Sequence, residues 1–190
     1  MSIPDDAKAT IRHDKVEDLG ATNPPTDHRG LRVLGFEECL ERLRTAPVGR
    51  LALVYTGEPV VFPVNHAVDG VDVVFRTSWG SKLQVVENSG VVAYEVDGYD
   101  SLSESGWSVL VKGRAQLAYE SADTDRYDQL GLRSWADPEG RGFWMRIRPV
   151  EITGREVIPP PGCPHTSAHV SGGTLSAVSP RAPLGRDAPR

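Results

Sequence analysis

The chain has 190 residues and a formal net charge of −5, and hydrophobic residues make up 39% of it. This length predicts one domain with tails, and the acidic balance argues against a general nucleic-acid binder, which needs a basic surface. No apolar run approaches the roughly 18 residues of a membrane span, and the N-terminus lacks the apolar core of a signal peptide. Cys39 and Cys163 do not form a disulfide framework, so we expect a cytoplasmic protein with no membrane partner.

The two ends differ in composition from the middle. Residues 1–30 contain no aromatic residue, and residues 159–190 combine many prolines with no aromatic residue. Such segments cannot bury enough apolar surface to offset the entropy of ordering. We therefore predict a loosely packed or disordered arm at 1–30, a folded domain at 31–158 and a disordered tail at 159–190.

The domain begins with a helix and continues with strands. Phe36, Cys39, Leu40 and Leu43 fall at helical spacing, with Pro47 just past the end. After that the apolar period is mostly two, which indicates strands. The predicted strands are 48–55, 59–68, 73–77, 90–100, 107–119 and 142–157, and the further helices are 81–89 and 121–131. The first three strands are expected to form a meander, with a bulge at Gly113 and an edge or break at Pro149.

About six strands with short helices predict a mainly β fold, an antiparallel barrel that closes on itself. The runs "VVFPV" (60–64) and "WSVLV" (107–111) are apolar on both faces. One face can fill the barrel, and the other then needs a helix or a second subunit to cover it. This pattern favours a homodimer.

One stretch, "FRTSWGSKL" (75–83), concentrates groups that suit an anion. Thr77 and Ser81 offer hydroxyl groups, and Lys82 lies in the first turn of the following helix, where unpaired backbone N–H groups also favour negative charge. Arg76 is adjacent to Thr77 in the strand and should point to the opposite face. The alternative is that Ser81 caps the helix and Lys82 is solvated.

Arg50, at the start of the first strand, strengthens the anion interpretation. An arginine there is usually a surface charge. A meander that brings Arg50 close to Lys82 would clamp a phosphomonoester between a bidentate fork and a point charge.

The succession "APVGRLALV", "PVVFPVNHAVDG", "VVFRTSWGSKL", "VAYEVDGYD", "GWSVLVKGRA" and "WMRIRP" resembles the pyridoxamine 5'-phosphate oxidase-like superfamily. It is most similar to the actinobacterial flavin-nucleotide-binding branch. The resemblance covers residues 33 to about 156, and its most specific part is "PVN" followed by "FRT" and "GSKL".

The resemblance implies a split β-barrel homodimer that holds FMN, or in actinobacterial branches a deazaflavin coenzyme, at the subunit interface. By position, it implies phosphate contacts from Arg50, Leu51, Thr77, Ser81 and Lys82, and a strand bordering the flavin ring at Val64, Asn65 and His66. Arg76 would reach a second group or a neighbouring subunit. Ser108 falls near a position where the oxidases carry a glutamine, and this departure argues against the pyridoxamine phosphate reaction itself.

Several residues keep an ordinary structural alternative. His66 lies in an apolar strand, where a histidine is more often a hydrogen-bonded structural residue than a functional one. Trp79 and Trp107 could stack on a flavin or fill the core. Cys163–His169 offers three ligands in a tail, so we expect no metal site.

The sequence thus favours a flavin (FMN)-binding oxidoreductase acting on a small-molecule substrate that it does not identify, and it nominates no catalytic residue. A deazaflavin-dependent reductase on the same fold, or a non-catalytic flavin- or haem-binding module, are the alternatives.

Overall fold

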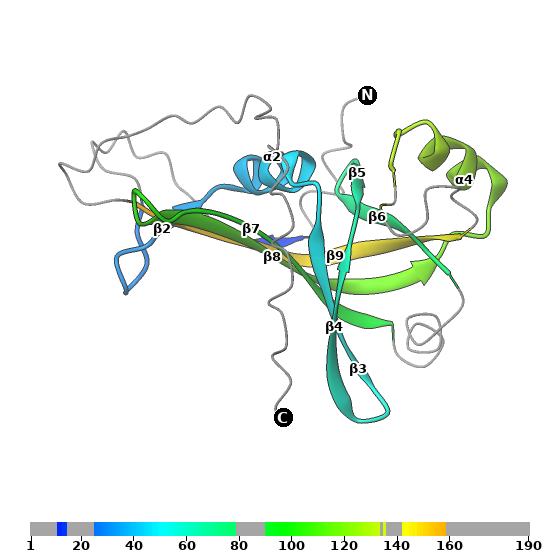
Figure 1. The fold of residues 1–190 in the computed structure, drawn as a ribbon, viewed down its shortest axis with the longest axis horizontal. Helices are drawn as coiled ribbons and strands as arrows, with labels where there is room; N and C mark the ends of the chain where they lie inside the picture. Colours follow the sequence, from blue (N-terminus) through cyan, green and yellow to red (C-terminus); the bar gives the residue numbers. More distant parts are fainter. Residues whose placement is uncertain (1–10, 15–24, 79–89, 134, 136–141, 159–190) are drawn as a thin grey trace, which may run out of the picture.

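The computed structural model describes residues 11–14, 25–78, 90–133, 135 and 142–158. These residues form a mainly antiparallel sheet with helices packed on it, which confirms the predicted β fold (Figure 1). The strands are β1 (Arg12–His13), β2 (Arg32–Leu34), β3 (Gly49–Tyr55), β4 (Glu58–Val64), β5 (Ala67–Asp69), β6 (Asp72–Thr77), β7 (Val91–Asp100), β8 (Ser105–Leu117) and β9 (Phe143–Val157), and the helices are α2 (Phe36–Thr45) and α4 (Ser121–Asp128). None of the helices in this described part of the chain is both long and apolar enough to cross a membrane.

The strands pair in the order β4-β3-β7-β8-β9-β6-β5, and β1 and β2 pair with β9. The predicted meander holds only in part: β6 pairs with β5, which contains the end of the predicted second strand, and with β9, but not with β4. The predicted strand 59–68 is divided by Asn65 and His66, which carry the chain from β4, at one end of this order, to β5 at the other. The sheet therefore curls into a split β-barrel.

Two irregularities fall where the sequence placed them. The β8–β9 register shifts between Lys112 and Gly113, as expected for a bulge. A Cβ at Gly113 would lie 2.3 Å from the Arg148 carbonyl oxygen, so no larger residue fits without a backbone shift. Pro149 lies in β9 between Ile147, where pairing with β6 ends, and Glu151, where pairing with β1 begins. A proline, which has no backbone N–H to donate, is tolerated at this position because neither β6 nor β1 pairs with it.

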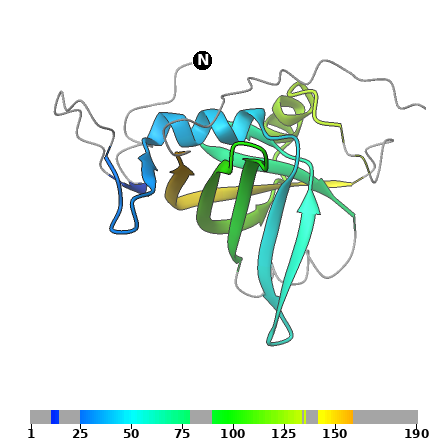
Figure 2. The same cartoon turned by 60° about the vertical axis from the view of Figure 1, so that its left-hand side comes forward.

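Helix α2 covers one side of the sheet (Figures 1 and 2). Its apolar stripe buries Cys39, Leu40 and Leu43 in the same cluster as Leu51 and Tyr94 of the strands. Burying each leucine stabilises the fold by about 1.5–3 kcal/mol. The Glu38 carboxylate accepts a hydrogen bond of 2.9 Å from the Gly35 backbone N–H, which satisfies a free donor at the start of the helix.

Helix α4 packs on the far ends of β6 and β9 through a second, smaller cluster of Val74, Tyr127 and Trp144. Arg76 pairs with Asp128 of α4. Its guanidinium also lies 4.5 Å from the centre of the Trp144 ring. These contacts join α4 to the sheet.

Two short segments before α2 contact β9. Ile11 is 7% exposed and belongs to the main core, and β1 and β2 pair with β9. The Arg155 guanidinium donates to Asp14 at 2.5 Å and to Asp27 at 3.2 Å. Residues 11–14 and 25–34 therefore pack on the sheet, while the domain boundaries at 31 and 158 stay a prediction.

The side of β3, β4 and β7 opposite their buried residues is here called the outer face. Ala52 lies on it, paired with Val61 and Ala93. Val54, Val61 and Val91 are 61%, 60% and 57% exposed. A sheet face this apolar is unusual in contact with water.

Candidate functional site

Arg50 lies on the outer face near the start of β3, with its side chain half exposed. Its Nη1 donates to Glu95 at 2.9 Å and to Asp97 at 2.8 Å. The Asp97 bond is the main cause that raises the pKa of Arg50. Burial is the main cause that raises the pKa of Glu95, and the Asp97 charge adds to it. An arginine therefore shares this surface with two carboxylates.

Ser108 lies on the same face as Arg50. It is exposed on β8, directly opposite Asp97 of β7 and Arg155 of β9. Because directly paired residues of neighbouring strands point to the same side, Asp97, Ser108 and Arg155 form one row across the sheet. Arg50 is paired with Glu95, two residues before Asp97, and reaches this row through its bond to Asp97. The structure thus brings Arg50 and Ser108 to one surface, through Asp97.

Leu51 and Val64 point the other way. They are 1% and 7% exposed and belong to the main core. Val64 pairs with Gly49, so the end of β4 lies beside the start of β3. Any contact of Leu51 or Val64 with a ligand would have to come from the backbone.

Asn65 ties three segments together. Its Nδ2 donates to the Pro47 carbonyl at 2.9 Å, and its Oδ1 accepts from the Trp135 backbone N–H at 2.9 Å. The side-chain amide thereby fixes the end of α2 and the segment after α4 to the β4–β5 link.

His66 is 6% exposed, and its Nε2 lies 2.7 Å from the Leu43 carbonyl oxygen. Since a carbonyl only accepts, Nε2 carries the proton and Nδ1 bears a lone pair. Nδ1 is buried and has no hydrogen-bond partner among the described residues. Burial lowers the pKa of His66, so the ring is neutral near pH 7. The ring also meets Tyr94 edge-on, with centroids 5.2 Å apart.

Asn65 and His66 line a cavity of about 360 Å³, here called the His66 cavity. Arg44, Leu132, Arg133 and Trp135 are among its other lining residues. Sequence reasoning missed these four, because they come from α2 and from the segment after α4 and meet only in the fold. A tryptophan in an otherwise polar segment after the predicted helix 121–131 was the available signal.

Only residues 75–78 of the predicted phosphate turn, 75–83, are among the described residues. Thr77 is 6% exposed, and its hydroxyl donates to the Ser78 carbonyl at 3.3 Å. Arg76, next to it, lies between Asp128 and Trp144. Ser81 and Lys82, like Trp79, lie outside the described residues, and so does Cys163–His169.

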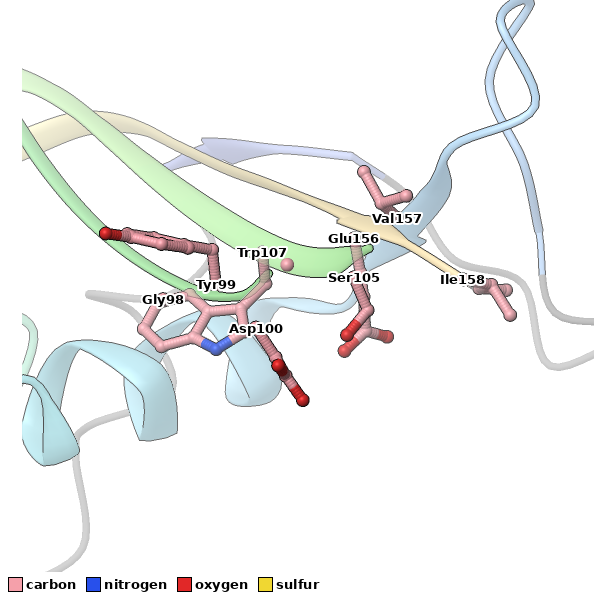
Figure 3. Close-up of a pocket in the computed structure, with 9 residues that line it drawn as sticks. Gly98, Tyr99, Asp100, Ser105, Trp107, Glu156, Val157 and Ile158 are labelled. Atoms are coloured by element: carbon pink, nitrogen blue, oxygen red, sulfur yellow. The ribbon is translucent and has the colours of Figure 1, made fainter. Parts of the chain in front are cut away.

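A second cavity, of about 570 Å³, lies at the end of the β7–β8 hairpin, and its described lining includes Trp107, which the sequence offered as a residue that could stack on a flavin (Figure 3). Trp107, Asp100 and Glu156 point to one side of the sheet there, and Val157 points to the other. The Arg42 guanidinium lies 4.9 Å from the Trp107 ring centre and donates to Glu156 at 3.1 Å. Trp107 thus has a structural partner.

Comparison with known proteins agrees with this fold. A protein-family model described as pyridoxamine 5'-phosphate oxidase matches residues 36–156. None of the curated proteins matches the sequence.

Solved structures are similar over about two thirds of the chain. A Corynebacterium glutamicum protein provisionally named a pyridoxamine 5'-phosphate oxidase shares 33% identity over 67% of this chain and 98% of its own, with a TM-score of 0.60. A Mycobacterium smegmatis FAD-binding protein shares 32% identity over 66% of this chain and 99% of its own, with a TM-score of 0.57. A Corynebacterium diphtheriae protein of unknown function shares 32% identity over 67% and 98%, with a TM-score of 0.57.

Proposed function

The chain belongs to the pyridoxamine 5'-phosphate oxidase family, and from this premise we propose that it is a cytoplasmic flavin-binding oxidoreductase that uses FMN on a small-molecule substrate. The Mycobacterium smegmatis relative, which binds FAD, supports a flavin as the cofactor. When bound, a flavin supplies the hydride chemistry, and the protein supplies orientation and a dry environment.

The observation that carries the proposal is the surface around Arg50. Both of its bonds to described side chains use Nη1, so its other N–H groups can turn to a phosphate. Its neighbours on the same face include Pro63, Ala52 and Ala93, which are small or flat and suit a planar ring. We propose that Arg50 contacts the flavin phosphate beside the carboxylates of Glu95 and Asp97, and that Ser81 and Lys82 complete the clamp.

We place the cofactor between two copies of the chain. The outer face exposes Val54, Val61 and Val91 beside Arg50. Pairing two such faces removes the apolar patch from water and encloses the flavin, as the family resemblance implies. In this arrangement the cofactor binds only the assembled dimer and stabilises it by mass action.

The visible spectrum of the purified protein tests the proposal most directly. Oxidised flavin gives two bands in the blue and near-ultraviolet, a deazaflavin one blue band, and haem a Soret band. Chromatography of the released cofactor then separates FMN from FAD. Reduction by a nicotinamide coenzyme supports the oxidoreductase role. Bound flavin that cannot be reduced in this way supports the non-catalytic module instead.

Titration with FMN and riboflavin tests the role of Arg50. The change Arg50→Gln should weaken FMN binding roughly 10-fold, because a charge-assisted bond to phosphate is lost, and should leave riboflavin unchanged. Arg44→Gln, at an exposed arginine of α2 on the inner side of the sheet, is the matched control. Equal loss for both ligands would show that Arg50 does not contact the phosphate.

A further inference from the structure

Glu95 of β7 lies between the two parts of the outer face that the proposed function assigns to the cofactor. Ala93, two residues before it on the same strand, is paired with Ala52, where the planar ring is placed. Arg50, directly across from Glu95 on β3, is the residue assigned to the phosphate. Residues two apart on a strand point to the same side and lie about 7 Å from each other. The part of the ligand that joins the ring to the phosphate therefore lies beside Glu95.

The carboxylate of Glu95 can accept more hydrogen bonds than Arg50 gives it. Its Oε2 accepts from Nη1 of Arg50 at 2.9 Å, and the same Nη1 donates to Oδ1 of Asp97 at 2.8 Å. An ionised carboxylate offers about four lone-pair positions, so this bond uses only part of the capacity of Glu95. The Glu95 side chain is 30% exposed. A ligand that lies on the outer face can therefore donate to it.

The charges of this cluster favour a ligand that carries hydrogen-bond donors beside its anion. The single guanidinium of Arg50 is bonded to two carboxylates, those of Glu95 and Asp97. A phosphate without such donors would bring its negative charge close to both carboxylates, which is unfavourable. Hydroxyl groups next to the phosphate relieve this repulsion, because they donate to a carboxylate while the phosphate accepts from Arg50. In FMN, the ribityl chain between the ring and the phosphate carries hydroxyl groups.

We propose that Glu95 determines specificity for the ribityl chain of the flavin by accepting hydrogen bonds from its hydroxyl groups. This inference rests on the proposed function, because it requires the flavin to lie on the outer face with its phosphate at Arg50. Asp97 lies two residues farther from Ala93 along β7 and acts on Arg50 alone. The two carboxylates thus differ in role, although both bond to the same nitrogen.

Titration of the full-length protein with lumiflavin, riboflavin and FMN tests the proposal. Lumiflavin has the ring without the ribityl chain, and riboflavin has the ribityl chain without the phosphate. The wild-type protein should bind riboflavin roughly 10-fold or more tightly than lumiflavin, because only riboflavin donates to Glu95. Flavin fluorescence, or equilibrium dialysis where the fluorescence does not change, gives each Kd. Equal affinities for lumiflavin and riboflavin would overturn the proposal.

Variants distinguish the acceptor from the charge. Glu95→Leu should weaken riboflavin binding roughly 5- to 20-fold, because the charged acceptor is lost. Asp97→Leu removes the same charge from Arg50 and should change riboflavin binding far less. Glu95→Gln keeps one acceptor oxygen, so it should show a smaller loss than Glu95→Leu, and it decides the question if the leucine variant does not fold. Equal losses in Glu95→Leu and Asp97→Leu would mean that charge alone matters and would contradict the role of Glu95.

The same titrations separate this inference from the proposed function. If the wild-type protein binds neither FMN nor riboflavin, the proposed function is wrong and the inference falls with it. If FMN binds and Arg50→Gln weakens it, but Glu95→Leu leaves riboflavin binding unchanged, only the inference is overturned. Tighter FMN binding in Glu95→Leu with unchanged riboflavin binding would likewise overturn it, because Glu95 would then only compete with the phosphate for Arg50.

Discussion

The two sides of β3, β4 and β7 are built from alternating residues of the same strands, yet they are completed in different ways. On the inner side, Leu51, Tyr94 and Val96 are nearly or fully buried against the core that contains Leu43 of α2. On the outer face, Val54 and Val61 are about 60% exposed beside the paired charges of Arg50. The same strands therefore bury one side within the described residues and leave apolar side chains exposed on the other.

The largest expected effect is on the inner side. Leu43→Ala should lower the free energy of unfolding by about 2–5 kcal/mol, because Leu43 is fully buried and truncation leaves a cavity. Val61→Ala, on the outer face, should cost less than about 0.5 kcal/mol when measured at low protein concentration. Urea denaturation of both variants checks the contrast.

The Leu43 and Val61 experiments can also contradict the contrast between a buried inner side and an exposed outer face. If Val61→Ala is as costly as Leu43→Ala even at low concentration, the outer face is already covered. A cost that grows with protein concentration would indicate a second copy as the cover.

Gly49→Ala should have the next largest effect. A Cβ at Gly49 would lie 2.2 Å from the Tyr94 hydroxyl oxygen and 2.3 Å from its ring Cζ. Overpacking of this kind costs about 1–3 kcal/mol. Tyr94→Phe should not rescue it, because the ring carbon would still clash. Thermal denaturation of the single and double variants measures this. Gly35→Ala, whose Cβ would meet only the Glu38 carboxylate at 3.6 Å, is the tolerated control.

His66 should make the inner side sensitive to pH. Burial lowers its folded-state pKa below the ordinary value of 6.5. As the pH falls below 6.5, His66 therefore takes up a proton in the unfolded chain before it does so in the folded chain. The stabilising contribution of the neutral ring, fully present above pH 6.5, is lost progressively until the pH reaches the folded-state pKa of His66. The slope is at most about 1.4 kcal/mol per pH unit. Denaturation midpoints between pH 8 and 5 measure it.

The smallest effect should come from Arg155, the β9 member of the row that also contains Asp97 and Ser108. Arg155 holds Asp14 and Asp27, but its side chain is 32% exposed, and such ion pairs contribute about 0–1 kcal/mol. Arg155→Gln should therefore change global stability by less than about 1 kcal/mol while increasing hydrogen exchange in residues 11–14 and 25–34. Lys112→Gln is the control. A loss above about 2 kcal/mol would mean that the Arg155 ion pairs contribute more to global stability than partly exposed ion pairs do.

Sequence periodicity located the strands but not their partners. The alternation in 48–55 and 90–100 depends on local burial, so β3 and β7 were predictable. The pairing of β6 with β9 joins residues such as Thr77 and Phe143, and no local pattern records a contact at that separation. The expected meander therefore holds only as two separate hairpins, β3–β4 and β5–β6. The break at Asn65 and His66 was hidden because both sit in an apolar run.

The candidate site, like the fold, could be predicted from the sequence only in part. Residue type alone indicated Arg50 as an anion ligand, but Glu95 and Asp97 became visible as its partners only through strand register. The His66 cavity needs Arg133 and Trp135 to fold back onto the β4–β5 link. Chemistry could be predicted from single residues, whereas their assembly depends on topology.

The central place of β9 has a consequence for how the chain folds. This strand pairs with β1, β2, β6 and β8. During synthesis, the edges of those earlier strands stay open until residue 157 has left the ribosome. Only local units such as the β7–β8 hairpin can form before then. We infer that closure is slow and late, and that chains interrupted before residue 143 expose strand edges to aggregation.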